Sequence, residues 1–123
     1  ENIKIIKIDN TGNEDPNELF SINNSFANEI ISTNDGFVLV GYKIIDGIHK
    51  NVYIAKFNFN QIEWEQDFGC NGDDEGFDIK ETFEGGVGLG GYVIGATIDN
   101  NNELDAWLIK TNHIGETNTI ECD

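Results

Sequence analysis

The stretch GFVLVGY, at Gly36–Tyr42, is echoed 50 residues later by GVGLGGY, at Gly86–Tyr92, with four of the seven positions identical. A short chain of 123 residues that repeats itself in this way is expected to be built from one structural unit used more than once. Both stretches are apolar and rich in strand-forming residues or Gly. The echo therefore predicts that other segments of the chain also recur, at a spacing of about 50 residues.

Other segments recur at nearly the same spacing. One pattern is two apolar residues, a Lys and a polar turn, and its lysines Lys7, Lys56 and Lys110 lie 49 and 54 residues apart. Two further pairs are 48 and 49 residues apart. The recurring segments are IIKIDNTG (5–12), IAKFNFNQ (54–61) and LIKTNHIG (108–115); NELF (17–20) and EQDF (65–68); and EIISTNDG (29–36) and DIKETFEG (78–85).

Each recurring segment has the pattern of a β-strand. In IEWEQDF (62–68), Ile62 and Trp64 alternate with Glu63 and Glu65, which is the period of a half-buried strand. Gly-containing turns such as Asn34-Asp35-Gly36 separate the segments, and no segment keeps a helical period. The few residues by which the second copy is longer are expected in a surface loop, TIDNNNELD (97–105).

Four strands in about 50 residues indicate an all-β fold of β-propeller blades, each a four-stranded antiparallel sheet. The glycines are then expected to let neighbouring blades approach closely, with Gly88 and Gly90 replacing Val38 and Val40 in the second copy. The expected array is a single domain over 1–123, with the end of one blade at 1–20, a blade at 21–68 and another at 69–123.

About ten strands give two and a half blades, which is too few for a closed propeller. Three explanations remain open at this point. The chain is a piece of a larger propeller, it closes as a ring of several copies, or it is an open stack with covered edges.

The order of motifs resembles the repeat of exported bacterial and archaeal β-propeller proteins and lipoproteins, related in style to Kelch and PQQ-like propellers. The residues that carry the resemblance are Trp64, Phe68 and Gly69, then 74–79, 84–92 and 105–115. The chain departs from the pattern at Glu84, where the family has Asp, at Asn51 in the place equivalent to Asp105, and at Gln61 in place of a turn Gly. The resemblance implies an extracellular or cell-surface protein, and it leaves the function open because propellers host many activities.

Composition excludes several classes of partner. The chain has 23 acidic residues against 7 basic ones and a net charge of −16, so it lacks the clustered cations that nucleic acids and anionic membranes require. No apolar run approaches the length of a membrane span. The charge fits either a solvated acidic surface or cation binding.

Cys70 and Cys122 are the two cysteines, and no zinc-type spacing accompanies them. In an exported protein they are candidates for one disulfide bond, which depends on the geometry that the fold gives them.

Two acidic segments are candidate calcium sites, because calcium prefers carboxylate and carbonyl oxygens on a bent loop. The stronger candidate is Asp99, Asn101, Glu103 and Asp105, which alternate like the start of a calcium loop but lack the later Gly and Glu of an EF-hand. The weaker candidate is Asp73, Asp74 and Asp78, with Glu75 beside them. The competing interpretations are a solvated loop for the first and carboxylates that bond turn amides for the second.

No catalytic motif is evident. His49 and His113 have no Ser, Cys or acid at motif spacing, there is no G-x-S-x-G, and GVGLGG is not followed by the Lys and Ser/Thr of a phosphate loop. Trp64 and Trp107 are expected in the core between blades, with a stacking platform for sugar as the alternative.

The sequence therefore predicts a non-catalytic extracellular β-propeller scaffold or binding module without an enzymatic activity. The alternative is a calcium-stabilised or carbohydrate-binding, lectin-like propeller, with calcium as its one cofactor. The expected partners are copies of the chain or the remainder of a larger propeller.

Overall fold

The computed structural model describes residues 1–84, 90–117 and 120–122, with the backbone alone for residues 16–19. This part of the chain forms nine β-strands and no helix, so the all-β prediction is confirmed and no helix here could cross a membrane. The strands are β1 (Asn2–Ile8), β2 (Glu14–Asn23), β3 (Ser25–Ser32), β4 (Phe37–Ile44), β5 (Lys50–Phe57), β6 (Ile62–Phe68), β7 (Glu75–Glu81), β8 (Tyr92–Asn100) and β9 (Glu103–Thr111).

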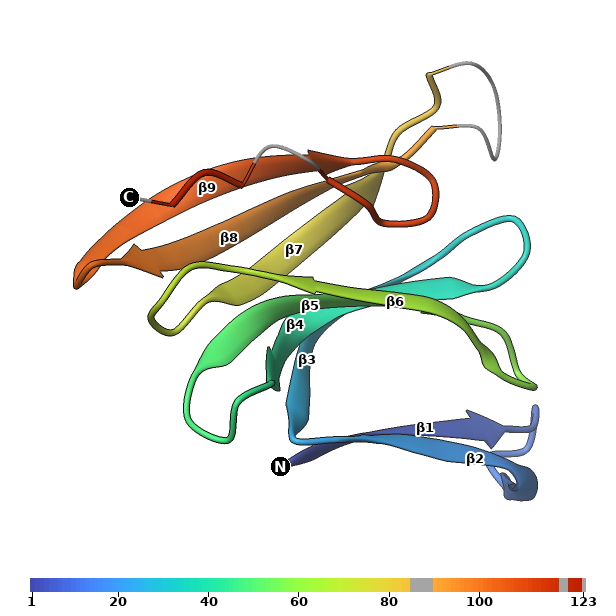
Figure 1. Cartoon of the computed structure of the whole chain (residues 1–123). Helices are drawn as coiled ribbons and strands as arrows, with labels where there is room; N and C mark the ends of the chain where they lie inside the picture. The colour runs from blue at the N-terminus through green and yellow to red at the C-terminus, as the bar shows by residue number, and fades with distance from the viewer. Residues whose placement is uncertain (85–89, 118–119, 123) are drawn as a thin grey trace.

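The strands form three antiparallel sheets in which each strand pairs with its neighbour in sequence. The first sheet is β1–β2, the second is β3–β4–β5–β6 and the third is β7–β8–β9. Figure 1 shows the three sheets stacked one on another, in chain order. Among the described residues, only the second sheet contains the full unit of four strands that the sequence predicts.

Two apolar layers hold the stack together. Between the second and third sheets, Val38, Val40, Val52 and Ile54 pack against a set that includes Ile94, and all five are fully buried. Between the first and second sheets the layer comprises Ile3, Ile22, Leu39, Tyr53, Ala55 and Phe57. Because β4 and β5 are covered on both faces, they read in the sequence as continuous apolar runs. Strand β6 is at the edge of the second sheet, and its burial alternates as predicted.

The two glycine-rich stretches do not occupy equivalent positions. The turn hydrogen bond from the N–H of Thr33 to the carbonyl of Gly36 (2.8 Å) recurs between Thr82 and Gly91 (2.8 Å), and a strand follows each glycine directly. The structural counterpart of GFVLVGY is therefore GYVIGAT, at 91–97. Tyr92 begins β8, whereas Tyr42 lies near the end of β4, so the predicted alignment of GFVLVGY with GVGLGGY is wrong.

The strand register gives the same result. A bulge between Ala27 and Glu29 in β3 recurs between Gly76 and Asp78 in β7, and the partners across from Gly76 and Asp78 are Ala96 and Gly95. The additional residues of the second copy thus lie in the β7–β8 connection, 82–91. Gly86 to Leu89, the first part of the quoted stretch, lie outside the described residues. Gly88 is one of them, so its predicted packing role is untested.

The segment TIDNNNELD is a tight hairpin and not the surface loop that the repeat spacing predicts. Strand β8 runs to Asn100, strand β9 begins at Glu103, and these two residues pair across the turn. Asn101 and Asn102 have φ angles of 55° and 66°, the left-handed conformation that a two-residue hairpin turn requires and that Asn tolerates.

The close approaches at glycine lie mainly within a sheet and not between blades, contrary to the expectation. A methyl group on Gly41 would overlap the carbonyl oxygen of Phe26 in the neighbouring strand β3, and one on Gly90 would overlap that of Thr82. Two glycines of the third-sheet segment do lie against the second sheet. A methyl group on Gly76 would lie 2.5 Å from Cγ2 of Val40, and one on Gly115, in the turn after β9, would overlap Cζ3 of Trp64.

Candidate functional site

The connections between strands gather at two opposite ends of the stack (Figure 1). The β1–β2, β3–β4, β5–β6 and β7–β8 connections lie at one end, and the β2–β3, β4–β5, β6–β7 and β8–β9 connections lie at the other. Each end brings together side chains that the sequence analysis singled out. The second end holds the cysteines and most of the candidate calcium ligands, and the first holds an intersheet cleft.

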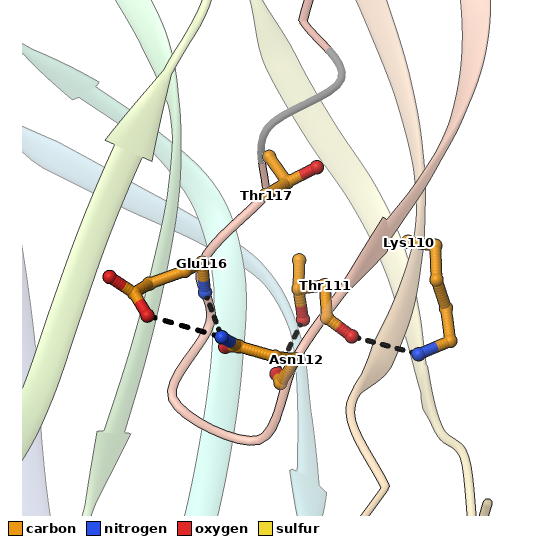
Figure 2. Close-up of a pocket in the computed structure, with 5 residues that line it drawn as sticks. All are labelled: Lys110, Thr111, Asn112, Glu116 and Thr117. Carbon is orange, nitrogen blue, oxygen red and sulfur yellow. Dashed lines mark hydrogen bonds between the residues drawn. The ribbon is translucent and has the colours of Figure 1, made fainter.

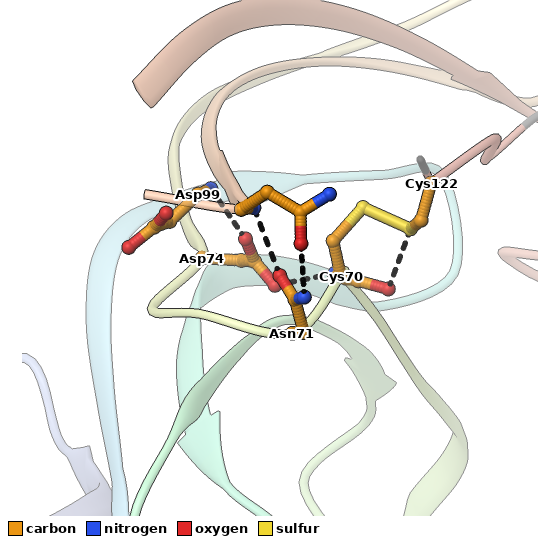
Figure 3. The surroundings of a disulfide bond; sticks show 7 residues. Cys70, Asn71, Asp74, Asp99 and Cys122 are labelled. Carbon is orange, nitrogen blue, oxygen red and sulfur yellow. Dashed lines mark hydrogen bonds between the residues drawn. A yellow bond between two sulfur atoms is a disulfide. The ribbon is translucent and has the colours of Figure 1, made fainter. Parts of the chain in front are cut away.

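Cys70 and Cys122 are joined in a disulfide bond (Figure 3). Cys70 follows β6 and Cys122 is near the C-terminal end of the described chain, 52 residues later. Cys70 and Ile120 both pack against the apolar layer between the second and third sheets. The bond therefore ties the segment after β9 to the edge of the second sheet.

Asp74 lies beside the disulfide and is fully buried. Its two carboxylate oxygens accept hydrogen bonds from the N–H of Cys70 (2.7 Å) and of Asp99 (2.8 Å). Burial raises the pKa of Asp74, and these two hydrogen bonds oppose the rise. Asp73 likewise accepts a hydrogen bond from the N–H of Lys50 (3.0 Å). Both carboxylates thus bond backbone amides, which agrees with the interpretation that the acidic residues of this segment bond turn amides.

Asp99 and Asn101 come from the β8–β9 hairpin and meet the β6–β7 connection. The side chain of Asn71 donates to Oδ1 of Asn101 (2.8 Å) and accepts from its N–H (3.1 Å). Oδ1 of Asp99 is buried and has no hydrogen-bond partner. In the described part of the chain, it is the one buried side-chain nitrogen or oxygen without a hydrogen-bond partner.

The remaining candidate calcium ligands lie elsewhere. Glu103 and Asp105 are exposed on β9, and Asp78 is on β7, where it accepts a hydrogen bond from the N–H of Gly95 (3.2 Å). Glu75 accepts a hydrogen bond from Asn28 (2.8 Å). Within the described residues, no three His, Cys, Asp or Glu side chains are grouped so that they could hold a metal ion. Calcium binding therefore stays a prediction.

At the other end of the stack, a cavity of about 260 Å³ opens between the second and third sheets. We call it the intersheet cleft. Its lining combines carboxylates, a lysine and two aromatic rings, and the residues are Asn34, Asp35, Lys56, Glu63, Trp64, Glu81, Gly90, Tyr92, His113 and Ile114.

Lys56 is the cation of the cleft and only 12% of its side chain is exposed. Its Nζ lies 2.6 Å from Asp35 Oδ1 and 3.4 Å from Glu63 Oε2. Burial lowers the pKa of Lys56, but the hydrogen bond to Asp35 and the charge of Glu63 outweigh it and leave the pKa above its ordinary value. Lys56 therefore stays charged and is held in place by two carboxylates.

Trp64 and Tyr92 form the aromatic part of the cleft, with ring centroids 5.8 Å apart and planes at 52°. Both Trp64 and Trp107 also pack against the apolar layer between the second and third sheets, which fits the predicted core role. Trp64 alone of the two lines the cleft. Tyr92 is 4% exposed, and burial raises the pKa of its phenol.

A second hollow of about 550 Å³ lies beside the last turn and is shown in Figure 2. Its polar groups bond one another. The Asn112 side chain accepts from the N–H of Ile114 (3.1 Å) and of Glu116 (2.9 Å), and it donates to the Glu116 carboxylate (3.1 Å). Asn58 caps the β5–β6 turn in the same way. The hollow is therefore explained by turn structure.

Sequence reasoning singled out Trp64 for a ligand role but not Tyr92, Glu81 or Asp35. Lys56 carried a signal, because it is one of the three lysines of the repeat. The convergence of these side chains depends on the packing of two sheets, which no local pattern encodes.

A scan against protein-family models, a search of curated proteins and a search of solved structures each found no match. The resemblance to an exported propeller repeat is thus untested and stays a prediction.

Proposed function

We propose that the chain is part of a non-catalytic β-propeller that serves as an extracellular scaffold or binding module. The observation that carries the proposal is that the first and third sheets expose faces equivalent to those that the second sheet buries. In β5, Ile54 is buried against the third sheet and Phe57 against the first. Lys56 and Lys110 hold equivalent places, across from Val38 and Val93, so Leu108 of β9 corresponds to Ile54 of β5.

The terminal sheets expose the faces that the second sheet buries. Leu108 is 80% exposed, whereas Ile54 is 0% exposed. At the other end, Ile6 and Ile8 of β1 correspond to Ala55 and Phe57 of β5 and are 45% and 55% exposed. A stack in which each sheet needs a neighbour on both faces is the arrangement of propeller blades. The disulfide supports an oxidising, extracellular environment.

The exposed face of the third sheet gives a test. We expect the isolated chain to self-associate at high concentration, and we expect Leu108→Lys to weaken that association at least about tenfold, because a Leu side chain loses its burial. Light scattering across a concentration series measures the effect.

Ile48→Lys is the matched control. Ile48 lies in the β4–β5 loop and is 75% exposed, so the variant has the same charge change and a similar starting exposure but lies off the sheet face. A chain that stays monomeric throughout, or an equal response of the two variants, would count against the proposal.

A calcium-stabilised propeller is the second candidate, and the buried unpaired Oδ1 of Asp99 beside Asp74 favours it. If calcium binds, the melting temperature rises with added CaCl2 and returns with EDTA. Tenfold excess over the dissociation constant corresponds to about 1.4 kcal/mol of stabilisation. Asp99→Asn should lose the response, and an unchanged wild-type midpoint removes this candidate.

A further inference from the structure

Tyr92 presents to the intersheet cleft a hydroxyl that no group of the described chain bonds. The residue as a whole is 4% exposed, and its hydroxyl makes no hydrogen bond in the part of the chain that the structure describes. Because Oδ1 of Asp99 is the one buried side-chain polar atom without a partner in the described chain, the Tyr92 hydroxyl reaches solvent in the cleft, where a ligand can bond it. The ring lines the intersheet cleft, so a ligand in the cleft would supply the partner.

The groups around this hydroxyl define the chemistry of such a ligand. Lys56 offers N–H donors, while Glu63 and Glu81 offer carboxylate acceptors. The carboxylate of Glu81 makes no hydrogen bond or ion pair within the described residues. The Tyr92 hydroxyl both donates and accepts. Donors and acceptors side by side match a ligand with several hydroxyl groups. An anionic ligand would face three carboxylates and a single lysine, which disfavours it.

The aromatic rings and the size of the cleft further restrict the class of ligand. Trp64 and Tyr92 give the cleft an apolar wall, against which the C–H face of a sugar ring can pack. The volume of about 260 Å³ is below the range of about 300–1,000 Å³ that drug-sized ligands occupy. The cleft therefore suits one small polyhydroxylated ring.

We propose that the intersheet cleft binds a single neutral sugar unit, with the Tyr92 hydroxyl and Glu81 as its hydrogen-bonding groups and Trp64 as its apolar wall. This inference rests on the proposed binding function and gives it a ligand class and a site.

The test uses the full chain and a panel of D-glucose, D-galactose, D-mannose and N-acetyl-D-glucosamine. Titration is followed by tryptophan fluorescence and by two-dimensional NMR. We expect at least one sugar to shift the signals of Tyr92 and Trp64, with a dissociation constant on the order of 1–10 mM for so small a contact. Tyr92→Phe should weaken that binding about fivefold, because it removes one hydrogen bond to the ligand.

Tyr53→Phe is the matched control. Tyr53 is also buried, but it lies in the layer toward the first sheet and donates to Glu65 (3.1 Å). We expect this variant to bind sugar as the wild type does. Tyr92→Phe should keep wild-type stability, since its hydroxyl has no partner to lose, so a loss of binding cannot be attributed to unfolding.

Two results would overturn the inference. The first is the absence of a signal change with every sugar of the panel at concentrations about tenfold above the expected dissociation constant. The second is preferential binding of ethylammonium that Glu81→Gln abolishes, which would make the cleft an amine site. Neither result affects the Leu108 experiment, so failure of this inference is distinguishable from failure of the proposed function.

Discussion

Replacement of Gly41 by alanine is expected to lower the free energy of unfolding by at least about 3 kcal/mol. The added methyl group would overlap the carbonyl oxygen and carbon of Phe26 and the Cα of Ala27, all of them backbone atoms of β3. No side-chain rotation relieves such a contact, so the central sheet must open at the bulge or the strands must separate. Urea unfolding followed by circular dichroism measures the loss.

Gly47→Ala is the control because it adds the same methyl group where nothing lies within 4 Å. Gly47 has a φ of 83°, so alanine there is expected to cost about 1–2 kcal/mol from its backbone conformation alone. Equal losses in the two variants would show that β3 does not lie against Gly41 as described.

Removal of the disulfide is expected to have the next largest effect. The bond closes a loop of 52 residues, for which the chain-entropy relation gives about 4 kcal/mol. The double variant Cys70→Ala/Cys122→Ala should therefore melt more than about 10 °C below the wild type, because each kcal/mol corresponds to several degrees in a domain of this size. Differential scanning calorimetry gives the two midpoints.

A reducing agent distinguishes the contribution of the covalent bond to stability from that of the cysteine side chains. The wild type with reductant should approach the double variant, and the double variant itself should not respond. A wild-type midpoint that reductant leaves unchanged would show that the bond contributes nothing to stability.

Much of the strand content was predictable, because the local signals agree with the fold. The continuous apolar run of β4 and the alternation of β6 each match the burial that the sheets impose. The recurrence of lysines at Lys7, Lys56 and Lys110 located equivalent strands correctly. The turn signal at Asn34-Asp35-Gly36 also lies where β3 and β4 are connected.

The register of the second copy was not predictable in this way. Identity of Gly, Leu and Tyr made GVGLGGY seem the counterpart of GFVLVGY, whereas the pairing of Gly76 with Ala96 fixes the true register. Similar letters in a glycine-rich segment carry little information, because glycine has no side chain to specify which face is buried. Cross-strand hydrogen bonds decide the register instead.

The acidic hairpin shows a related limit. Asp99, Asn101, Glu103 and Asp105 alternate along the sequence, and alternation in a calcium loop is the same pattern as alternation on a strand. The left-handed pair Asn101–Asn102 closes a two-residue turn, which sends Asp99 toward Asp74 and leaves Glu103 exposed. Only the turn conformation distinguishes a β-hairpin from a calcium loop.

The sequence by itself determined an all-β chain of repeated strands, because side-chain periodicity and β-propensity act over a few neighbouring residues. The tertiary structure alone decided which side chains meet. Lys56, Tyr92 and Glu81 belong to three strands of two sheets, and they share a cleft because apolar packing presses those sheets together in one register. Contacts between sheets depend on the summed packing of many side chains, so no single segment contains them.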